Sequence, residues 1–453
     1  MKKIALIVLG TLLITFAFAQ EQSDSSKLEK IKKGWSFGLL PAISFDSDLG
    51  FQYGGLVNFY NYGDGSRYPR YDHSLYLEAS RFTKGSGIFR IMYDTDKLID
   101  GIQITTDMSY LPDMAYRFYG YNGYDAVYNS DWTTDEATDY KSRLFYNLDR
   151  KFFRFKTDWQ GKLYGEGLKW VAGVTLYNIG MSEVDVDALN EGKEDVDKLP
   201  ANADMPGLYK KYQDWGIISA EEADGGFLPL LKAGLVYDTR DNRPNPMKGL
   251  WTELVLVNAP EFLGAESGFT KLSIIHRHYF TLIPKNLSFA YRLSYQGTIA
   301  GKTPFYAQPL MATSMLRGAY SEGLGGGKSL RGVIRNRVIG DGYVFGNFEF
   351  RWKFARFNFL KQNFYLGLNA YTDVGQVVQN TDMDYDAIRT EIEAAGESFD
   401  NYFKPNSEKL HMSVGAGLRV AMNQNFIIAV DFGKAIEKQD GNTGLYIGLN
   451  YLF

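Results

Sequence analysis

The feature that most restricts how this chain can fold is a repeated alternation of apolar and polar residues. In residues 343–354, Phe348 and Phe350 fall on one face of an extended segment, and Glu349 and Arg351 fall on the other. The same alternation recurs in residues 287–296, 363–375, 411–421 and 425–433. A period of two indicates β-strands that have one apolar and one polar face.

The N-terminus predicts the compartment. Residues 1–19 have the features of a secretory signal peptide: a short basic start, an uncharged apolar stretch, and small residues at Ala17 and Ala19 before the cleavage point. The apolar stretch is shorter than the ~20 residues that a spanning helix needs. We therefore expect residues 1–19 to be removed and residues 20–34 to form a short periplasmic segment.

The rest of the chain predicts a membrane barrel. Beyond residue 19 the sequence has no run of 18 apolar residues. A chain without such a run enters lipid only as a closed β-barrel, because lipid offers no hydrogen-bond partner and every backbone N–H and C=O group must be paired within the protein. A water-soluble β-sandwich also alternates. Here, however, the apolar faces carry many aromatic residues and the segments are about ten residues long, as in outer-membrane barrels. The sequence therefore predicts an all-β fold, a transmembrane antiparallel β-barrel over residues 35–453.

Composition excludes several classes of function. The 453 residues include 49 Lys and Arg against 53 Asp and Glu, and this net charge of −4 argues against nucleic-acid binding. The absence of Cys excludes disulfides, thiolate metal sites and a Cys nucleophile. His276 and His278 share a strand face, but no third ligand stands at metal spacing. We expect no cofactor, no metal and no nucleic-acid partner.

The strand count is predicted from the alternating segments. Candidate strands lie near residues 35–45, 50–61, 71–83, 86–95, 101–111, 140–150, 152–163, 167–180, 229–239, 249–258, 268–281, 286–299, 342–355, 363–374, 411–421, 425–434 and 444–453. These are about 17 segments, whereas single-chain bacterial barrels have an even number. We therefore predict 16 strands, with the surplus segment upstream of residue 165.

Two acidic insertions, residues 181–228 and 376–410, interrupt this series. Long polar loops belong on the outer face of such barrels, so we expect solvated charged loops there, with a short helix over residues 384–396. Binding of a divalent cation by their carboxylates is the alternative. At the other end of the chain, the alternation continues to Tyr451 and Phe453, which resembles the C-terminal signal for insertion of outer-membrane barrels. An ordinary edge strand is the alternative reading.

Four short motifs follow one another in the second half of the chain. They are Asp238-Thr239-Arg240-Asp241 with Pro246 and Gly249, then Ser329-Leu330-Arg331-Gly332, Phe345-Gly346-Asn347-Phe348-Glu349-Phe350-Arg351, and Tyr371-Thr372-Asp373-Val374-Gly375. Together they resemble the BamA/TamA outer-membrane assembly family, the bacterial surface antigen superfamily. In that family the loop motif usually begins with Val and ends with an aromatic residue, where this chain has Leu330 and Val333.

The resemblance implies that the long glycine-rich loop, residues 300–341, folds back into the lumen of a 16-stranded barrel. It also implies that Arg331, next to Gly332, meets acidic partners on the barrel wall. Glu349 and Asp373 lie on the polar faces of their segments, so both can point inward. A guanidinium held by two carboxylates forms charge-assisted hydrogen bonds and would anchor the loop. The alternative is that these are unrelated lumen charges.

The first motif is expected to be a structural periplasmic turn. Pro246 prevents further ladder pairing and Gly249 permits a sharp return, while Asp238, Arg240 and Asp241 have charges suited to pairing at the rim. Large members of the family carry periplasmic POTRA domains before the barrel. The few residues between the signal and the first predicted strand are too short for such a domain.

By this resemblance the protein is expected to act in the bacterial outer membrane, in the insertion or translocation of proteins or lipids, and not as an enzyme. Its expected partners are outer-membrane lipids and client outer-membrane proteins or lipoproteins. A weak seam between the first and last strands, thinned by Gly444 and Gly448, would offer an edge to a substrate. Two alternatives remain: a passive channel or structural barrel, and an outer-membrane esterase or phospholipase that uses Ser288, Ser294 or Ser413.

Overall fold

The computed structural model describes residues 32–453, apart from residues 68–69, 196–197, 243–244, 315–322, 360–361 and 423–425. The signal peptide expected at residues 1–19 lies outside the described residues, as does most of the segment 20–34. The strands are β1 Trp35–Pro41, β2 Ser44–Asp46, β3 Gly50–Asn61, β4 His73–Phe82, β5 Gly87–Ile99, β6 Ile102–Arg117, β7 Asn147–Tyr164, β8 Leu168–Ser182, β9 Gly225–Asp238, β10 Gly249–Ala259, β11 Phe269–Ile283, β12 Leu287–Gly301, β13 Gly342–Phe359, β14 Gln362–Gln379, β15 His411–Met422, β16 Phe426–Ala435 and β17 Thr443–Leu449. The α-helices are α2 Val186–Asn190, α3 Leu208–Asp214, α4 Ala220–Ala223 and α5 Tyr385–Ala394.

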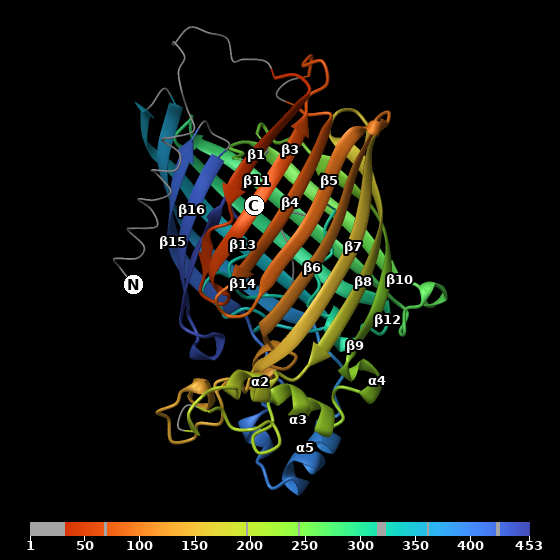
Figure 1. Cartoon of the computed structure of the whole chain (residues 1–453), viewed down its shortest axis with the longest axis vertical. Helices are drawn as coiled ribbons and strands as arrows, with labels where there is room; N and C mark the ends of the chain where they lie inside the picture. The colour runs from red at the N-terminus through yellow and green to blue at the C-terminus, as the bar shows by residue number, and fades with distance from the viewer. Residues whose placement is uncertain are drawn as a thin grey trace.

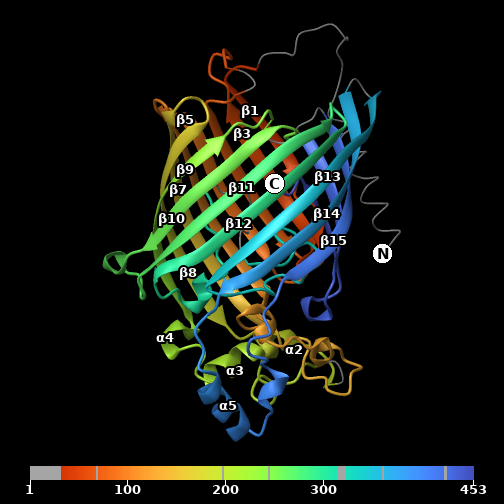
Figure 2. The same ribbon diagram turned by 180° about the vertical axis from the view of Figure 1, so that it is seen from behind.

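These strands form one antiparallel sheet that closes on itself as a barrel (Figures 1 and 2). β1 and β2 both pair with β3, one after the other, so they are two parts of a single barrel strand interrupted at residues 42–43. The barrel formed by the described residues therefore has sixteen strands, as predicted. The surplus segment lies upstream of residue 165, as predicted. It is residues 140–150: residues 140–146 belong to a loop, and residues 147–150 belong to β7, the strand that also contains residues 152–163.

The two faces of the strands differ as the alternation predicts. On β13, Phe350 and Trp352 are 52% and 51% exposed, whereas Glu349 and Arg351 between them are 0% and 1% exposed. The exposed residues form the apolar outer wall, and the buried polar residues face the lumen. Of the helices among the described residues, none has both the length and the apolar character needed to cross a membrane.

Three long loops, residues 118–146, 183–224 and 380–410, pack together at one end of the barrel (Figure 1). We call them the loop cap, and since long loops face outward in such barrels, this end is the extracellular end. The cap has an apolar core that includes Tyr119, Trp132, Phe145, Tyr212, Trp215, Ile388, Ile392, Tyr402 and Phe403. The acidic side chains of the two insertions are mostly exposed, as expected of solvated charged loops, but the loops also bury aromatic and aliphatic side chains against one another, which was not expected.

Local sequence explains the helices of the cap. Ile388 and Ile392 are one turn apart on α5 and are both buried, and Asp384 caps the helix by accepting hydrogen bonds from the backbone N–H groups of Asp386 and Ala387 at 3.1 Å each. The predicted short helix over residues 384–396 is confirmed. No cluster of three or more carboxylate or imidazole groups suited to a metal occurs in the described part of the chain.

The segment between β12 and β13, residues 302–341, is the lumen loop. Its described parts, 302–314 and 323–341, lie inside the barrel, and most of their residues are buried. Leu330 and Val333, the residues that depart from the family motif, are both fully buried in an apolar cluster with Tyr343 and Phe345 at the extracellular end of β13.

Candidate functional site at the lumen loop and the seam

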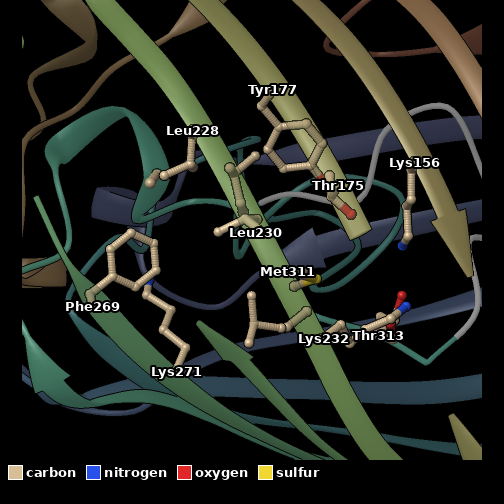
Figure 3. A pocket seen from close by; sticks show the side chains of 14 residues that line it. Lys156, Thr175, Tyr177, Leu228, Leu230, Lys232, Phe269, Lys271, Met311 and Thr313 are labelled. Atoms are coloured by element: carbon tan, nitrogen blue, oxygen red, sulfur yellow. The ribbon is translucent and has the colours of Figure 1, made fainter. Parts of the chain in front are cut away.

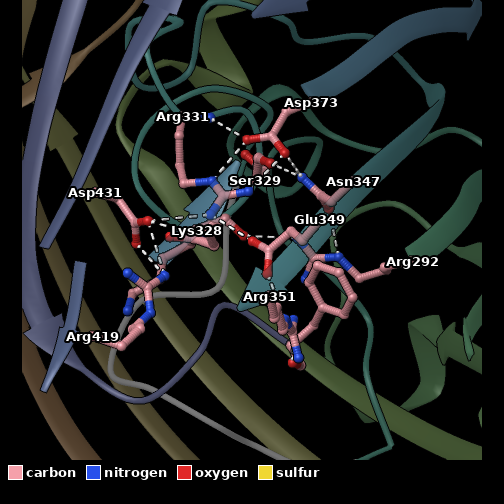
Figure 4. Close-up of polar contacts among 12 residues, drawn as sticks. Arg292, Lys328, Ser329, Arg331, Asn347, Glu349, Arg351, Asp373, Arg419 and Asp431 are labelled. Atoms are coloured by element: carbon pink, nitrogen blue, oxygen red, sulfur yellow. Dashed lines mark hydrogen bonds and ion pairs between the residues drawn. The ribbon is translucent and has the colours of Figure 1, made fainter. Parts of the chain in front are cut away.

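Arg331 of the lumen loop lies against the acidic wall of β13 and β14 (Figure 4). Its Nε and Nη2 donate to the two carboxylate oxygens of Asp373 at 2.8 and 2.9 Å, and its backbone N–H donates to Oδ2 at 3.0 Å. Its Nη1 forms an ion pair with Oε1 of Glu349 at 2.6 Å. The guanidinium also lies over the ring of Tyr371, 3.4 Å from the centroid. The structure therefore brings together Arg331, Glu349 and Asp373.

Further polar residues complete this cluster. Asn347 donates to Oδ1 of Asp373 and to the carbonyl of Ser329, both at 2.7 Å. Arg351 donates to Glu349 at 2.8 Å, and Nη2 of Arg419 donates to both oxygens of Asp431 at 2.9 Å. Three arginines thus alternate with three carboxylates: Arg331, Arg351 and Arg419 with Glu349, Asp373 and Asp431. This balance of charge makes burial of the cluster tolerable, since an unpaired charge would be costly in the lumen.

Gly332 brings the lumen loop into backbone contact with β16. Its φ is +101°, and a Cβ there would lie 2.6 Å from backbone atoms of Gly433 and Lys434. A Cβ on Gly433 would in turn lie 2.3 Å from the carbonyl oxygen of Arg331. Two glycines facing each other therefore permit an approach that no larger residue would allow. The N–H of Gly332 also donates to the hydroxyl of Tyr446 on β17 at 3.3 Å.

The barrel closes at a seam where β17 meets β2. Two residue pairs join these strands among the described residues, Tyr446 with Asp46 and Ile447 with Phe45. Directly after β2, the backbone N–H and the hydroxyl of Ser47 donate to the carbonyl of Leu445 at 3.1 Å each, and the N–H of Leu445 donates to that hydroxyl at 2.6 Å. β1, the other part of the first barrel strand, pairs with β3, and its Phe37 and Leu39 are each 73% exposed. By contrast, β13 and β14 pair along almost their whole length. The seam predicted between the first and last strands is thus short.

The lumen loop touches both sides of this seam. Gly327 packs so closely on Tyr446 of β17 and on Asp46 of β2 that a Cβ would lie 2.7 Å from the Tyr446 ring and 3.3 Å from the Asp46 carboxylate. Arg335 donates through its backbone N–H to Asp48, in the turn after β2, at 3.5 Å. Burial, together with the charge of Asp46, raises the pKa of Asp48 to about 6. The loop that is anchored on β13 and β14 therefore also lines the seam.

The predicted periplasmic turn lies at the end of the barrel opposite the loop cap. Arg240 forms a bidentate pair with Asp238, with both distances at 2.8 Å, and Asp241 accepts the backbone N–H groups of Met247 and Lys248 at 3.0 and 3.2 Å. Gly249 has a φ of +100° and faces the carbonyl of Thr239, as a sharp return requires. Pro246 is buried, and Arg243 and Pro244 lie outside the described residues.

One contact of this turn was not predicted. Nδ2 of Asn245 donates to the hydroxyl of Tyr365 on β14 at 2.9 Å, so the turn reaches across the barrel end. The end of the chain also differs from expectation, because β17 ends at Leu449 instead of continuing to residue 453. Tyr451 and Phe453 are buried, and the guanidinium of Arg351 lies 4.4 and 4.7 Å from their ring centroids. Their proposed role as an insertion signal remains a prediction.

The residues that the motifs missed are those supplied by other strands. Asn347 lies within one of the four motifs. The strands that the resemblance did not single out supply Arg419, Asp431, Gly433 and Tyr446. These residues lie on the inward faces of β15 to β17. The alternation of these strands was the only sequence signal that could have placed them in the lumen. Ser288, Ser294 and Ser413, considered for an esterase, have no hydrogen bond to a His within the described ranges; His411 instead contacts Asp440 at 2.6 Å and Glu408 at 3.2 Å.

A family model described as the Omp85 superfamily domain matches residues 116–453. The chain belongs to the Omp85 superfamily. Its fold is similar to that of BamA from Haemophilus ducreyi lacking POTRA domains 1–3, with 14% identity and a TM-score of 0.54, over 93% of this chain and 71% of that one. It is also similar to CdiB from Escherichia coli, with 12% identity and a TM-score of 0.55, over 93% of this chain and 63% of that one. The chain thus spans less than two thirds of CdiB.

No curated protein sequence matches this chain. The Omp85 family and the BamA-like barrel make it a bacterial outer-membrane protein, and at the level of the family they support protein insertion or translocation at that membrane. The described residues comprise the barrel and its loops and contain no POTRA-like domain.

Proposed function

We propose that this Omp85 protein assists the insertion or translocation of other proteins, or of lipids, at the outer membrane by opening its seam. The observation that carries this proposal is the short pairing of β17 with β2, which among the described residues consists of Tyr446 with Asp46, Ile447 with Phe45 and the adjoining hydrogen bonds between Ser47 and Leu445. A sheet edge that is barely paired can exchange its partner for a strand of a client at little cost in backbone hydrogen bonds.

The lumen loop would keep the rest of the barrel intact while the seam opens. Its anchor, Arg331 with Glu349 and Asp373, lies on β13 and β14, away from the seam. Its contacts at the seam are weaker: the packing of Gly327 on Tyr446, the 3.3 Å hydrogen bond from Gly332 and the 3.5 Å hydrogen bond from Arg335 to Asp48. Opening therefore breaks contacts with Tyr446 before it disturbs the buried ion pairs.

The test locks the seam covalently. Phe45→Cys with Ile447→Cys places two thiols on paired residues across the seam, where antiparallel partners have Cα atoms about 4.5–5.5 Å apart, within the range of a disulfide. A matched control, Phe348→Cys with Thr372→Cys, places the same bridge between β13 and β14. Each variant is reconstituted in liposomes, and the folding rate of an added client barrel is measured.

We expect the wild-type protein and the oxidised control to accelerate client folding, and the oxidised seam variant to do so only after reduction. No acceleration by the wild-type protein would overturn the proposal. Large, stable single-channel steps in place of acceleration would favour a passive channel. Labelling of a serine by a fluorophosphonate would favour an outer-membrane esterase.

A further inference from the structure

A hollow lies on the outer wall of the barrel, across β1 and β3 to β7 (Figure 1). Its volume is about 500 Å³, which is within the usual range for ligand pockets. The small cavity inside the barrel, between Lys232 and the lumen loop, has by comparison about 40 Å³ and holds only a few water-sized groups (Figure 3). The hollow on the outer wall is therefore large enough for a chain-like ligand, and the inner cavity is not.

Small residues on two neighbouring strands create the hollow. Gly55 of β3 pairs with Ala79 of β4, and both are exposed. A Cβ on Gly55 would have no atom of the described residues within 4 Å beyond its chain neighbours, so the space above this residue is open. Around it lie larger apolar side chains, which include Leu39, Val57, Leu77, Phe89, Tyr110 and Phe153. The hollow is therefore apolar, and it lies on the face of the wall that meets the hydrocarbon of the membrane.

The register of β3 and β4 places a polar pair directly beyond the hollow, toward the extracellular end. Tyr53 pairs with Arg81, two positions along each strand from the pair of Gly55 with Ala79. Because side chains two residues apart share a face of a strand, Tyr53 and Arg81 also point outward. Tyr53 is 50% exposed, and Arg81 is exposed as well. A tyrosine and an arginine on the outer face mark the level at which hydrocarbon gives way to headgroups.

The charge of Arg81 is available to a ligand. Its guanidinium lies 5.6 Å from the ring centroid of Phe89 on β5, a residue that also lines the hollow. No carboxylate in the part of the chain that the structure describes forms an ion pair with Arg81. A guanidinium at the headgroup level matches a phosphate, to which it can donate two parallel hydrogen bonds.

We infer that this hollow binds a lipid with an anionic phosphate headgroup, whose acyl chain lies over Gly55 and Ala79 and whose phosphate contacts Arg81. The order of features along the two strands fits such a molecule from end to end: first the apolar pair of Val57 with Leu77, then the open space, and then the polar pair. Two sources have this chemistry, a phospholipid and a phosphorylated glycolipid of the outer leaflet.

A lipid in this place would border the first barrel strand. Leu39 of β1 forms one side of the hollow, and β1 belongs to the strand whose other part, β2, meets β17 at the seam. The inference goes beyond the proposed function and does not rest on it, because lipid binding needs no opening of the seam. A barrel that binds the lipid but accelerates no client folding would contradict the proposed function alone.

The first test measures lipid retention by native mass spectrometry of the full chain in detergent. The protein is incubated separately with phosphatidylglycerol, with lipid A, and with phosphatidylcholine, which has a phosphate but no net charge. We expect anionic lipid to be retained more strongly than phosphatidylcholine, and the anionic lipid that is retained more identifies the source. Equal retention of all three lipids would overturn the inference. So would release of the bound lipid by inorganic phosphate, because a ligand held by its headgroup alone does not need the hollow.

Two variants test the two ends of the site. Arg81→Gln should lower retention of anionic lipid about fivefold, whereas Lys162→Gln, which removes an exposed positive charge at the periplasmic end of β7, should not. Gly55→Leu fills the open space and should also lower retention, whereas Ala370→Leu, at an exposed position of β14, should not. Unchanged retention in Arg81→Gln or in Gly55→Leu would contradict the inference.

A further measurement needs no variant and so remains decisive if the variants do not fold. Crystals of the wild-type protein grown with phosphatidylglycerol that carries brominated acyl chains should show anomalous peaks over Gly55 and Ala79. A hollow without bromine would show that no acyl chain is held there.

Discussion

The wall formed by β13 and β14 and the seam between β2 and β17 are held in opposite ways. β13 pairs with β14 from Gly342 to Phe359, whereas the described residues of β17 and β2 form two residue pairs. The lumen loop contacts both regions. On the wall it is held by buried ion pairs of Arg331, and at the seam by close packing on Tyr446.

The difference shows how one loop serves two purposes. Buried ion pairs resist breakage, because separating them leaves uncompensated charges. Packing against a ring and two long hydrogen bonds, from Gly332 and Arg335, can be lost and regained at low cost. The barrel therefore has a permanent attachment on one side of the loop and a reversible one on the other, and the following changes test that contrast.

The largest effect is expected from Arg331→Ala. The substitution leaves the carboxylates of Glu349 and Asp373 buried without their shared guanidinium, which costs about 3–5 kcal/mol of stability. The measurement is the heat-dependent mobility shift and the melting temperature in detergent. Arg331→Lys keeps the charge but loses the bidentate geometry, so its loss should be intermediate. Unchanged mobility in Arg331→Ala would show that the loop is held by something else.

A smaller loss is expected from Gly332→Ala. The new Cβ would lie 2.6 Å from the backbone of Gly433 and Lys434, and the residue would be held at a φ of +101°, at a cost of about 1–3 kcal/mol. Gly448→Ala on β17 is the matched control, because a Cβ there has nothing within 4 Å. Thermal melting of both variants measures the difference. Equal destabilisation would mean that the close approach of the loop to β16 does not matter.

Removal of one hydroxyl should affect the seam alone. Tyr446→Phe loses the 3.3 Å hydrogen bond from Gly332 but keeps the ring on which Gly327 packs, at a cost of about 1 kcal/mol. Amide hydrogen exchange of β17 and β2 should become faster, while exchange in β13 and β14 should be unchanged. Faster exchange in all four strands would show that the seam and the wall are not separate.

The sequence predicted the wall far better than the seam. On β13 and β14, strict alternation was enough to place Glu349 and Asp373 inward, and the family resemblance implied that Arg331 lies beside them. The seam depends on where pairing stops. The alternation predicts neither the interruption at residues 42–43 nor the end of β17 at Leu449. An unpaired segment can have the same alternation as a paired one.

The loop cap was missed for a different reason. Residues 118–139 have no period, and Trp132 is buried by contacts with loops far away in sequence, such as the one that contains Tyr402. Short-range patterns do not reveal such packing. The same holds for Asn245, whose partner Tyr365 stands 120 positions further along the chain.

The smallest effect is expected from pH at the seam. Burial and the charge of Asp46 raise the pKa of Asp48 from 3.8 to about 6 when the seam is closed. An opened seam would hydrate Asp48 and restore its ordinary pKa, so the closed state binds a proton that the open state releases. Closure is then favoured at low pH and weakens as the pH rises through about 6.

The pKa of about 6 already includes the opposing charges of Arg117 and Arg335, so a return to 3.8 on opening predicts at most about tenfold more opening at pH 7.5 than at pH 5. The rate at which Ile447→Cys reacts with a membrane-permeant thiol reagent, corrected for thiolate fraction, measures this opening. Asp48→Asn should react at the slow rate at both pH values, because its amide stays neutral. A matching cysteine at Thr372, on the wall, should show no pH dependence after the same correction. If the rate at the Thr372 cysteine also changed with pH, the pH effect would belong to the whole barrel, and opening at the seam alone would be contradicted.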